Sequence, residues 1–395
     1  MTCCNSSKFM LLTKVEEKAL SGQYGTPTML AHKILLSIGE ATDASKLVPV
    51  KWAHLSGANF NTIGDAGLDF LKSISNETKF SIFTTINPMG YDRNKPEFVS
   101  DEFRIKQKDI TDAYEQMGVV PSYSCTPYEI FDMPPKNTMV SFAESNAAVI
   151  SNSIFGLLTN KESALSALAS AITGKAPYSE LRVEEFRHPK ERIMMADCDL
   201  SNELEYGMLG YFAGKEVKGS SVAIDGTRHL DLINAKSLSA SIGTSGYCGM
   251  FTNQSPEGQV ETITYDKAER VKVFDELSTA EDGDIIALGS PQLGLDELNK
   301  VALSVDNKKF TKPCMIFCAR SIYEKARMTQ ISQKIEKAGA KIICDACTCL
   351  TPLITRDCYD GVITNSVKAS YYLNKSNKVP VCLMDIKNIL KNYVS

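Results

Sequence analysis

Short apolar segments typical of β-strands alternate with longer amphipathic segments typical of helices through much of this sequence. The pattern is clear over residues 79–118, where a run rich in β-branched and aromatic residues (79–86) precedes a polar turn and a helical segment that ends at Gly118. The same order returns from residue 284 onward. Strands that alternate with helices favour a parallel sheet covered by helices, so the sequence predicts an α/β fold.

The middle of the chain departs from this pattern and is predicted to form a smaller lobe rich in strands. One helix is expected near residues 202–212, and the Gly-Thr-Ser-Gly sequence at 243–246 is interpreted as a hairpin turn because it lacks the lysine of a phosphate-binding loop. These changes predict a first α/β domain over residues 1–185, the strand-rich lobe over 186–280 and a second α/β domain over 281–395. The strands expected in the lobe are 193–196, 221–224, 238–242 and 260–265.

Composition and charge narrow the classes of function. A net charge of −4, with scattered lysines and arginines, provides no basic surface for nucleic acid or a membrane, so neither partner is expected. No apolar run reaches the roughly 18 residues of a membrane span, and residues 1–10 lack the apolar core of a signal peptide, so a cytoplasmic location is expected. Twelve cysteines without an export signal then indicate metal-binding, catalytic or buried thiols rather than disulfides.

The stretch from Cys125 to Asn160 has the features of a site. Cys125 precedes a Thr-Pro turn. A strand-like run over residues 138–142 ends close to Glu144 and Ser145, where a helix of small residues begins. The first turn of such a helix presents unpaired N–H groups and the positive end of its dipole to an anion. The alternative is an ordinary strand, loop and helix with a buried cysteine, because free cysteine is often buried.

Polar turns follow four other predicted strands. Ligands of open α/β sheets bind at the carboxyl ends of the strands, so these turns are expected to share one rim. By contrast, Cys314 and Cys318 share one face of an apolar strand and are expected in the core, and His54 is expected to be a structural histidine. The turns carry Gly57, Ala58 and Asn59 after strand 47–55, Asn87 and Pro88 after 79–86, Cys344, Cys347 and Cys349 after 341–344, and Ser366 and Lys368 after 361–364.

Several of these segments form motifs that follow one another in a fixed order. They are Ala-His-Leu-Ser-Gly-Ala-Asn (53–59), Thr-Ile-Gly-Asp-Ala-Gly-Leu (62–68), Thr-Ile-Asn-Pro (85–88), Cys-Thr-Pro-Tyr (125–128), Ala-Glu-Ser-Asn-Ala (143–147) and Thr-Asn-Ser-Val-Lys (364–368). Together they resemble the aconitase X family over nearly the whole chain. The resemblance implies an aconitase-like fold of parallel sheets covered by helices, with substrate-binding turns in the first α/β domain and cluster-binding turns in the second.

The same resemblance implies an iron–sulfur hydro-lyase. Loss of a hydroxyl group needs a Lewis acid on the leaving oxygen, which an iron held by thiolates can supply. By position, Cys125 and Cys347 would hold an iron–sulfur cluster, expected to be of the 4Fe–4S type or a smaller iron centre. Lys368 would be the counter-charge for a carboxylate or phosphate. The substrate pocket would contain Gly57, Ala58, Asn59, Asn87, Pro88, Glu144, Ser145, Ser366 and Lys368.

The resemblance also implies a second polypeptide and a substrate class. A chain of this length is similar to the large subunit of two-subunit members, in which a small swivelling-domain subunit completes the heterodimer and carries the catalytic base. The sequence offers no convincing base of its own, since its four histidines are isolated. Archaeal two-subunit members dehydrate (R)-5-phosphomevalonate to trans-anhydromevalonate 5-phosphate in a modified mevalonate pathway of isoprenoid synthesis, and the Asn-Pro-Met-Gly turn at 87–90 is closer to this type. The alternative is a subunit of a cis-3-hydroxy-L-proline dehydratase.

One position departs from the family pattern. Where the family usually has Gly-Cys-Pro-His, with a third cluster thiolate, this chain has Gly-Ser-Pro-Gln at 289–292. Serine is a harder and less acidic ligand than a thiolate. Three outcomes stay open: Ser290 coordinates the metal weakly, Cys344 or Cys349 takes its place, or the metal centre is smaller or lost. In the last case the chain would be a non-catalytic binding or assembly subunit.

Overall fold

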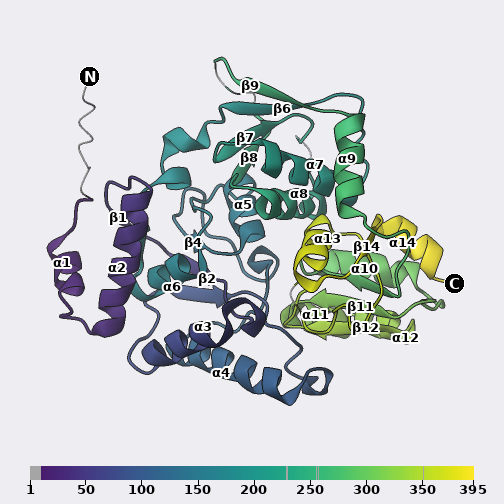
Figure 1. Cartoon of the computed structure of the whole chain (residues 1–395), viewed down its shortest axis with the longest axis horizontal. Coiled ribbons are helices and arrows are strands. Elements are labelled where there is room, and N and C mark those ends of the chain that lie inside the picture. Colours follow the sequence, from purple (N-terminus) through teal and green to yellow (C-terminus); the bar gives the residue numbers. More distant parts are fainter. Residues whose placement is uncertain (1–9, 228–229, 255, 257, 350) are drawn as a thin grey trace.

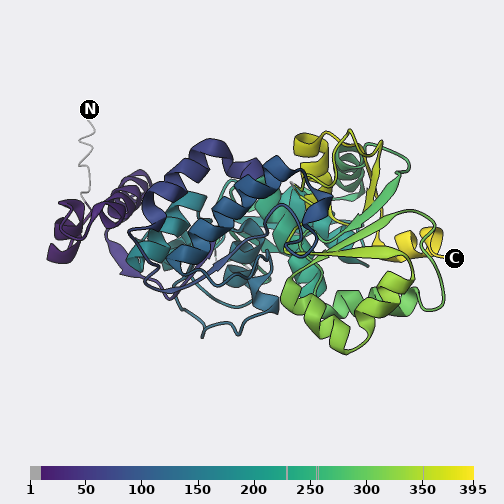
Figure 2. The ribbon, with the colours of Figure 1, turned by 90° about the horizontal axis from the view of Figure 1, so that it is seen from below.

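The computed structural model describes residues 10–227, 230–254, 256, 258–349 and 351–395. The chain forms three parts that follow one another in sequence, each built on a parallel sheet (Figure 1). Helices α1 (Lys14–Leu20) and α2 (Thr26–Ala41) lie at one end of the elongated molecule, and α14 (Ile386–Tyr393) lies at the other (Figure 2). None of the described helices has the length and apolar character that a membrane span needs.

The first part carries a three-stranded parallel sheet in the order β3-β2-β4. Its further elements are β1 (Leu47–Pro49), β2 (Trp52–Leu55), α3 (Phe60–Ser75), β3 (Phe83–Ile86), η1 (Pro96–Phe98), α4 (Asp101–Met117), η2 (Pro127–Glu129), β4 (Ser141–Phe142), α5 (Ser145–Ser153), α6 (Ala164–Thr173), β5 (Lys175–Pro177), η3 (Glu180–Arg182) and η4 (Glu184–Arg187). Ala53 of β2 lies opposite Thr84 of β3 and Ser141 of β4, so the three strands end at one edge. The predicted strand 47–55 is two strands, because β1 pairs antiparallel with β5 in a separate sheet. Helix α6 packs on β2, and α2 packs on α6.

The middle part carries a four-stranded parallel sheet in the order β8-β7-β6-β9. Its elements are β6 (Glu191–Met195), α7 (Glu203–Glu216), β7 (Ser221–Ile224), α8 (Leu232–Ser245), β8 (Met250–Thr252), β9 (Glu261–Tyr265) and α9 (Lys267–Leu277). The predicted strand 238–242 is wrong, because this segment lies inside α8, where Leu238 and Ile242 are buried one helical turn apart. The hairpin predicted at 243–246 is also wrong. Parallel neighbours such as β7 and β8 need a crossover connection, which α8 provides.

The last part carries a five-stranded parallel sheet in the order β12-β11-β10-β13-β14. Its elements besides α14 are β10 (Ile285–Leu288), α10 (Leu295–Ser304), β11 (Cys314–Cys318), α11 (Arg320–Met328), α12 (Ile331–Lys337), β12 (Ala340–Cys344), β13 (Val362–Thr364), α13 (Val367–Tyr372), the π-helical turn η5 (Leu373–Asn377) and β14 (Val381–Leu383). The predicted helix 322–338 is two helices, because Gln330 between them adopts a left-handed backbone with φ 61°. Strand β14, at the edge of the sheet, was not predicted.

The central strand β10 shows how the parts are joined. Ile285 and Ala287 pack into one core with the middle part, whereas Ile286 and Leu288 pack into the core on the opposite face of the sheet. A parallel strand buried on both faces has no polar alternation, and for this reason it appears in the sequence as a continuous apolar run. The first part has a separate core around β2 and α4. The α/β fold of parallel sheets covered by helices is therefore confirmed.

Candidate active site

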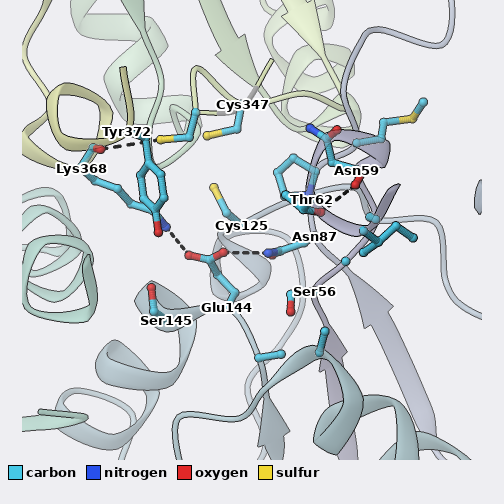
Figure 3. Close-up of a pocket in the computed structure, with 18 of the residues that line it drawn as sticks. Ser56, Asn59, Thr62, Asn87, Cys125, Glu144, Ser145, Cys347, Lys368 and Tyr372 are labelled. Carbon is cyan, nitrogen blue, oxygen red and sulfur yellow. Dashed lines mark hydrogen bonds and ion pairs between the residues drawn. The ribbon is translucent and has the colours of Figure 1, made fainter. Parts of the chain in front are cut away.

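A cavity of about 380 Å³ lies where the loops after β2, β3 and β4 meet the loops after β12 and β13 (Figure 3). Most residues that the sequence places in a site line this cavity, whereas Ser290 and Ser366 lie beside it. The lining residues are Ser56, Gly57, Ala58, Asn59, Thr62, Ile63, Asn87, Pro88, Met89, Cys125, Ala143, Glu144, Ser145, Ala164, Gly243, Cys347, Cys349, Lys368 and Tyr372.

The loop after β2 reaches the cavity through a glycine and a helix cap. Gly57 has φ +83°, and a Cβ there would lie 3.2 Å from Ile63 Cγ2, so the turn favours glycine. Asn59 caps α3, because its Oδ1 accepts a hydrogen bond from Asn61 N–H at 2.9 Å. The Thr62 hydroxyl donates to the Asn59 carbonyl at 2.6 Å. The first turn of α3 therefore borders the cavity.

A buried ion pair lines the cavity at Lys368 and Glu144. Lys368 Nζ bonds with Glu144 Oε1, and Asn87 Nδ2 donates to Glu144 Oε2 at 2.8 Å (Figure 3). Glu144 is also the N-cap of α5 and accepts from Asn146 N–H at 3.3 Å. Burial opposes the charge of Lys368, but the Glu144 carboxylate and other nearby groups together outweigh burial and raise the pKa of the lysine. Lys368 thus lines the cavity as a cation that is already paired with a carboxylate.

His54 lies behind Asn87 and sets its orientation. Since Asn87 Nδ2 donates to Glu144, Asn87 Oδ1 is left to accept from His54 Nε2–H at 3.1 Å. The other ring nitrogen, Nδ1, lies 2.7 Å from Thr85 Oγ1. Burial lowers the pKa of His54 to about 4, so the imidazole is neutral near pH 7. His54 is buried as a structural histidine should be, but the sequence did not reveal that it orients a residue of the cavity.

Three thiols face the cavity, one from the loop before η2 and two from the loop after β12. The neighbouring Cys125 and Cys349 thiols lower the pKa of Cys347 well below the usual value. Cys347 Sγ lies 3.4 Å from the Gly289 carbonyl oxygen, to which its thiol donates. Cys125 Sγ accepts from Gln292 N–H at 3.2 Å, and burial raises the pKa of this thiol. Cys349 Sγ lies 2.8 Å from Ser290 Oγ. Both neighbouring thiols therefore favour the ionised form of Cys347.

Ser290 and Ser366 lie beside the cavity rather than in its lining. Ser290 follows β10 and is buried, with its hydroxyl on Cys349. Ser366 is the N-cap of α13, where its Oγ accepts from Ala369 N–H at 3.0 Å and donates to the Ser290 carbonyl. Ser366 therefore does not line the cavity as the sequence suggested, because its hydroxyl is used to cap a helix and to hold the Ser290 loop.

Family models match this chain along its length: the aconitase X first domain over residues 9–185, the second domain over 190–280 and the third domain over 283–395. The phosphomevalonate dehydratase large subunit of Methanocaldococcus jannaschii is 35% identical, with 97% of this chain and 100% of that protein covered. The chain belongs to the aconitase X family. The crystal structure of Thermococcus kodakaraensis aconitase X in its holo form superimposes with a TM-score of 0.90 at 30% identity, covering 97% of this chain and 100% of that one.

A second group of aconitase X relatives acts on a different substrate. The cis-3-hydroxy-L-proline dehydratase of Hypocrea jecorina is 29% identical, with 89% of this chain but 63% of that protein covered. Relatives of both kinds are dehydratases. The family relation therefore places this aconitase X chain among the dehydratases, which are hydro-lyases.

The thiols suit the iron–sulfur cluster that an aconitase X site implies. Within the described ranges, no three His, Cys, Asp or Glu side chains are arranged to hold a single metal ion. A cluster distributes its thiolate ligands over several irons, so they need not meet at one point, and soft thiolates at one cavity match that donor set. Cys344 lies elsewhere, because it stands opposite Cys318 of the neighbouring strand β11 in the core of the last part. Cys314 is buried in the same core, as expected.

The loop after β12 that carries Cys347 and Cys349, called the thiol loop below, is held by charged residues to which the sequence did not point. Asp345, two residues before Cys347, is buried and has φ 61°. It pairs with Arg320 at 2.6 Å and with Arg93 at 3.1 Å, and Asp92 pairs with Arg320 as well. These contacts tie the first part to the loop that carries Cys347. An acidic residue between two cysteines was the available signal, but Arg93 is 252 positions away in the chain.

Proposed function

We propose that this chain is the large subunit of an iron–sulfur hydro-lyase that removes water from (R)-5-phosphomevalonate to give trans-anhydromevalonate 5-phosphate. The observation that carries the proposal is a single cavity that combines thiols with the buried Lys368–Glu144 pair. Similarity to archaeal phosphomevalonate dehydratase large subunits over 99–100% of their length supports the substrate. The hydroxyproline dehydratases are matched over a smaller share of their length, and they provide the alternative substrate.

The residues of the cavity have different roles in the proposed reaction. When bound, an iron–sulfur cluster held by Cys125 and Cys347 supplies a Lewis acid for the departing hydroxyl group. Lys368 binds the carboxylate or phosphate of the substrate, and Glu144 keeps the ammonium group in place. Asn87, oriented by His54, holds Glu144 in turn. Because the ion pair is buried, its electrostatic interactions with a bound substrate are stronger than they would be in water.

The proton acceptor is assigned to a second polypeptide. Among the described residues that line the cavity, Glu144 is the one carboxylate, and it is committed to Lys368 and Asn87. Cys347, whose pKa is lowered, belongs to the metal donor set. A small swivelling-domain subunit that closes over the cavity would bring the base and exclude water.

The test is anaerobic reconstitution of this chain with and without a coexpressed small subunit, followed by measurement of iron, acid-labile sulfide and product formation by NMR. The proposal expects a cluster, and conversion of (R)-5-phosphomevalonate only when both chains are present. Conversion of cis-3-hydroxy-L-proline instead would show that this compound, and not (R)-5-phosphomevalonate, is the substrate. A folded complex without iron or turnover would favour a second candidate function, which the serine at position 290 suggests: a binding subunit that has lost the cluster.

A further inference from the structure

Ser290 stands where the aconitase X family usually has a cysteine, and it touches a thiol from another loop. Its Oγ lies 2.8 Å from Cys349 Sγ. Ser290 follows β10 and Cys349 follows β12, so this contact joins loops 59 residues apart in sequence. Cys349 therefore brings a sulfur atom to within contact distance of the side chain at position 290.

Cys349 also belongs to the same group of thiols as the two expected cluster ligands. It lines the cavity together with Cys125 and Cys347. It lies two residues after Cys347 in the same loop, and all three cysteines are free of disulfides. The cavity thus has three thiols although position 290 contributes none.

We infer that Cys349 supplies the third thiolate of the cluster and that the Ser290 hydroxyl donates a hydrogen bond to its sulfur. The inference rests on the proposed function, because it takes the cluster as the resident cofactor. When the metal binds, the Cys349 thiol releases its proton to solvent and becomes the ligand. The Ser290 alcohol, which is far less acidic, keeps its proton and remains a donor.

The other cysteines that the structure describes do not fit this role. Cys344 is close in sequence, but it does not line the cavity and lies opposite Cys318 in the core. Cys358 is exposed and its sulfur accepts from the Thr355 hydroxyl. These two residues are therefore useful as control positions.

The two parts of the inference predict different effects. Removal of a ligand should lower the amount of bound metal. Removal of a hydrogen bond to a ligand sulfur should leave the metal bound but change its reduction potential, because hydrogen bonds to the sulfurs help to set that potential. A donor stabilises the more negative reduced state, so Ser290→Ala should lower the potential at an unchanged iron content.

The experiment measures iron and acid-labile sulfide per chain, the EPR spectrum and the reduction potential after anaerobic reconstitution of the full chain. Cys349→Ala should weaken iron binding by more than about 10-fold, since even the groups behind metal ligands are worth roughly 10–100-fold. Cys344→Ala and Cys358→Ser should give the same iron, sulfide, EPR and potential values as the wild-type chain. The double variant Cys349→Ala with Ser290→Cys should regain iron and sulfide, because it returns a thiolate to the same place.

Circular dichroism and thermal unfolding establish that each variant is folded. A folded Cys349→Ala chain with the original iron content and EPR spectrum overturns the inference, as does loss of iron in Ser290→Ala. If Cys349→Ala does not fold, Cys349→Ser, which preserves the size of the side chain, decides by the same criteria. If the wild-type chain takes up no iron, both the inference and the proposed cofactor are wrong. If it binds a cluster but has no dehydratase activity, only the proposed function is overturned.

Discussion

The two walls of the cavity are held together by different kinds of interaction. On the polar wall, Lys368, Glu144, Asn87 and His54 form a chain of hydrogen bonds in which each side chain fixes the next. On the thiol wall, the sulfurs of Cys125, Cys347 and Cys349 make separate contacts with Gln292 N–H, the Gly289 carbonyl and the Ser290 hydroxyl, and sulfur is a weak hydrogen-bonding atom. The thiol loop is held mainly from behind, by Asp345 and its two arginines.

This difference indicates which wall is complete before a ligand binds. Charge-assisted hydrogen bonds are strong and directional, so the polar wall is already organised for an anionic substrate. Removal of one thiol should cost the metal-free chain little stability, but all of the thiols are needed to bind metal. Substitutions on the thiol wall should therefore remove activity with little loss of stability, whereas substitutions on the polar wall should reduce both.

Cys347→Ala should have the largest effect on activity. A metal Lewis acid contributes several kcal/mol to such a reaction, so turnover should fall by more than roughly 1,000-fold. The free energy of unfolding of the metal-free chain should fall by only about 1 kcal/mol, because the lost contacts are weak. Anaerobic kinetics with the small subunit and urea denaturation measure the two effects. Cys314→Ala is the control, since it removes a buried thiol from the core and should keep iron and activity; equal iron loss in both variants would contradict the comparison.

Lys368→Met should have the largest effect on stability. It leaves Glu144 buried without its cation, which costs about 3–5 kcal/mol, and it removes the positive charge for the substrate. Urea denaturation should show the loss, and KM should rise. The matched control is Lys368→Met combined with Glu144→Gln, which removes both charges and should recover most of the stability but none of the substrate affinity. A double variant as unstable as the single one would show that the polar wall does not depend on this pair.

Some residues around the polar wall could be anticipated from the sequence, because they lie at the ends of predicted strands. Gly57, Asn87 and Glu144 each follow a recognisable strand, and the carboxyl ends of parallel strands share one edge. The support of the thiol loop could not be anticipated, because Arg93 and Asp345 meet only in the folded chain. Nothing local in a sequence specifies such a long-range pair, and the same is true of Glu144 and Lys368, which are 224 positions apart.

Helix α8 shows a different limit of sequence reasoning. Residues 238–242, Leu-Ser-Ala-Ser-Ile, place an apolar residue at every second position, which fits a strand. The same residues place Leu238 and Ile242 four positions apart, which fits one face of a helix. Only the parallel order of β7 and β8, which requires a crossover, decides for the helix.

His54 should make the polar wall sensitive to acid. Burial lowers its pKa from 6.5 to about 4, so between these values the unfolded chain binds a proton that the folded chain does not. The contribution of His54 to the free energy of unfolding is thus complete above pH 6.5 and is lost as the pH falls toward 4, by about 3 kcal/mol in total. Urea denaturation at several pH values should show a flatter dependence for His54→Asn. His188→Gln, at an exposed histidine, should keep the original slope; if it flattens the slope equally, His54 is not the acid-sensitive group.

Gly57→Ala should have the smallest effect and tests whether the loop after β2 belongs to the polar wall. Gly118, which ends α4, is the matched control, because it also has a left-handed backbone (φ 96°) but a Cβ there would meet nothing within 4 Å. Each alanine should cost about 1 kcal/mol of stability from backbone strain alone. Only at Gly57 would the new Cβ press on Ile63 and shift the first turn of α3, so only Gly57→Ala should raise KM, by less than about 10-fold. Equal KM values in the two variants would mean that the loop after β2 takes no part in substrate binding, and that the polar wall is confined to the side chains around Glu144 and Lys368.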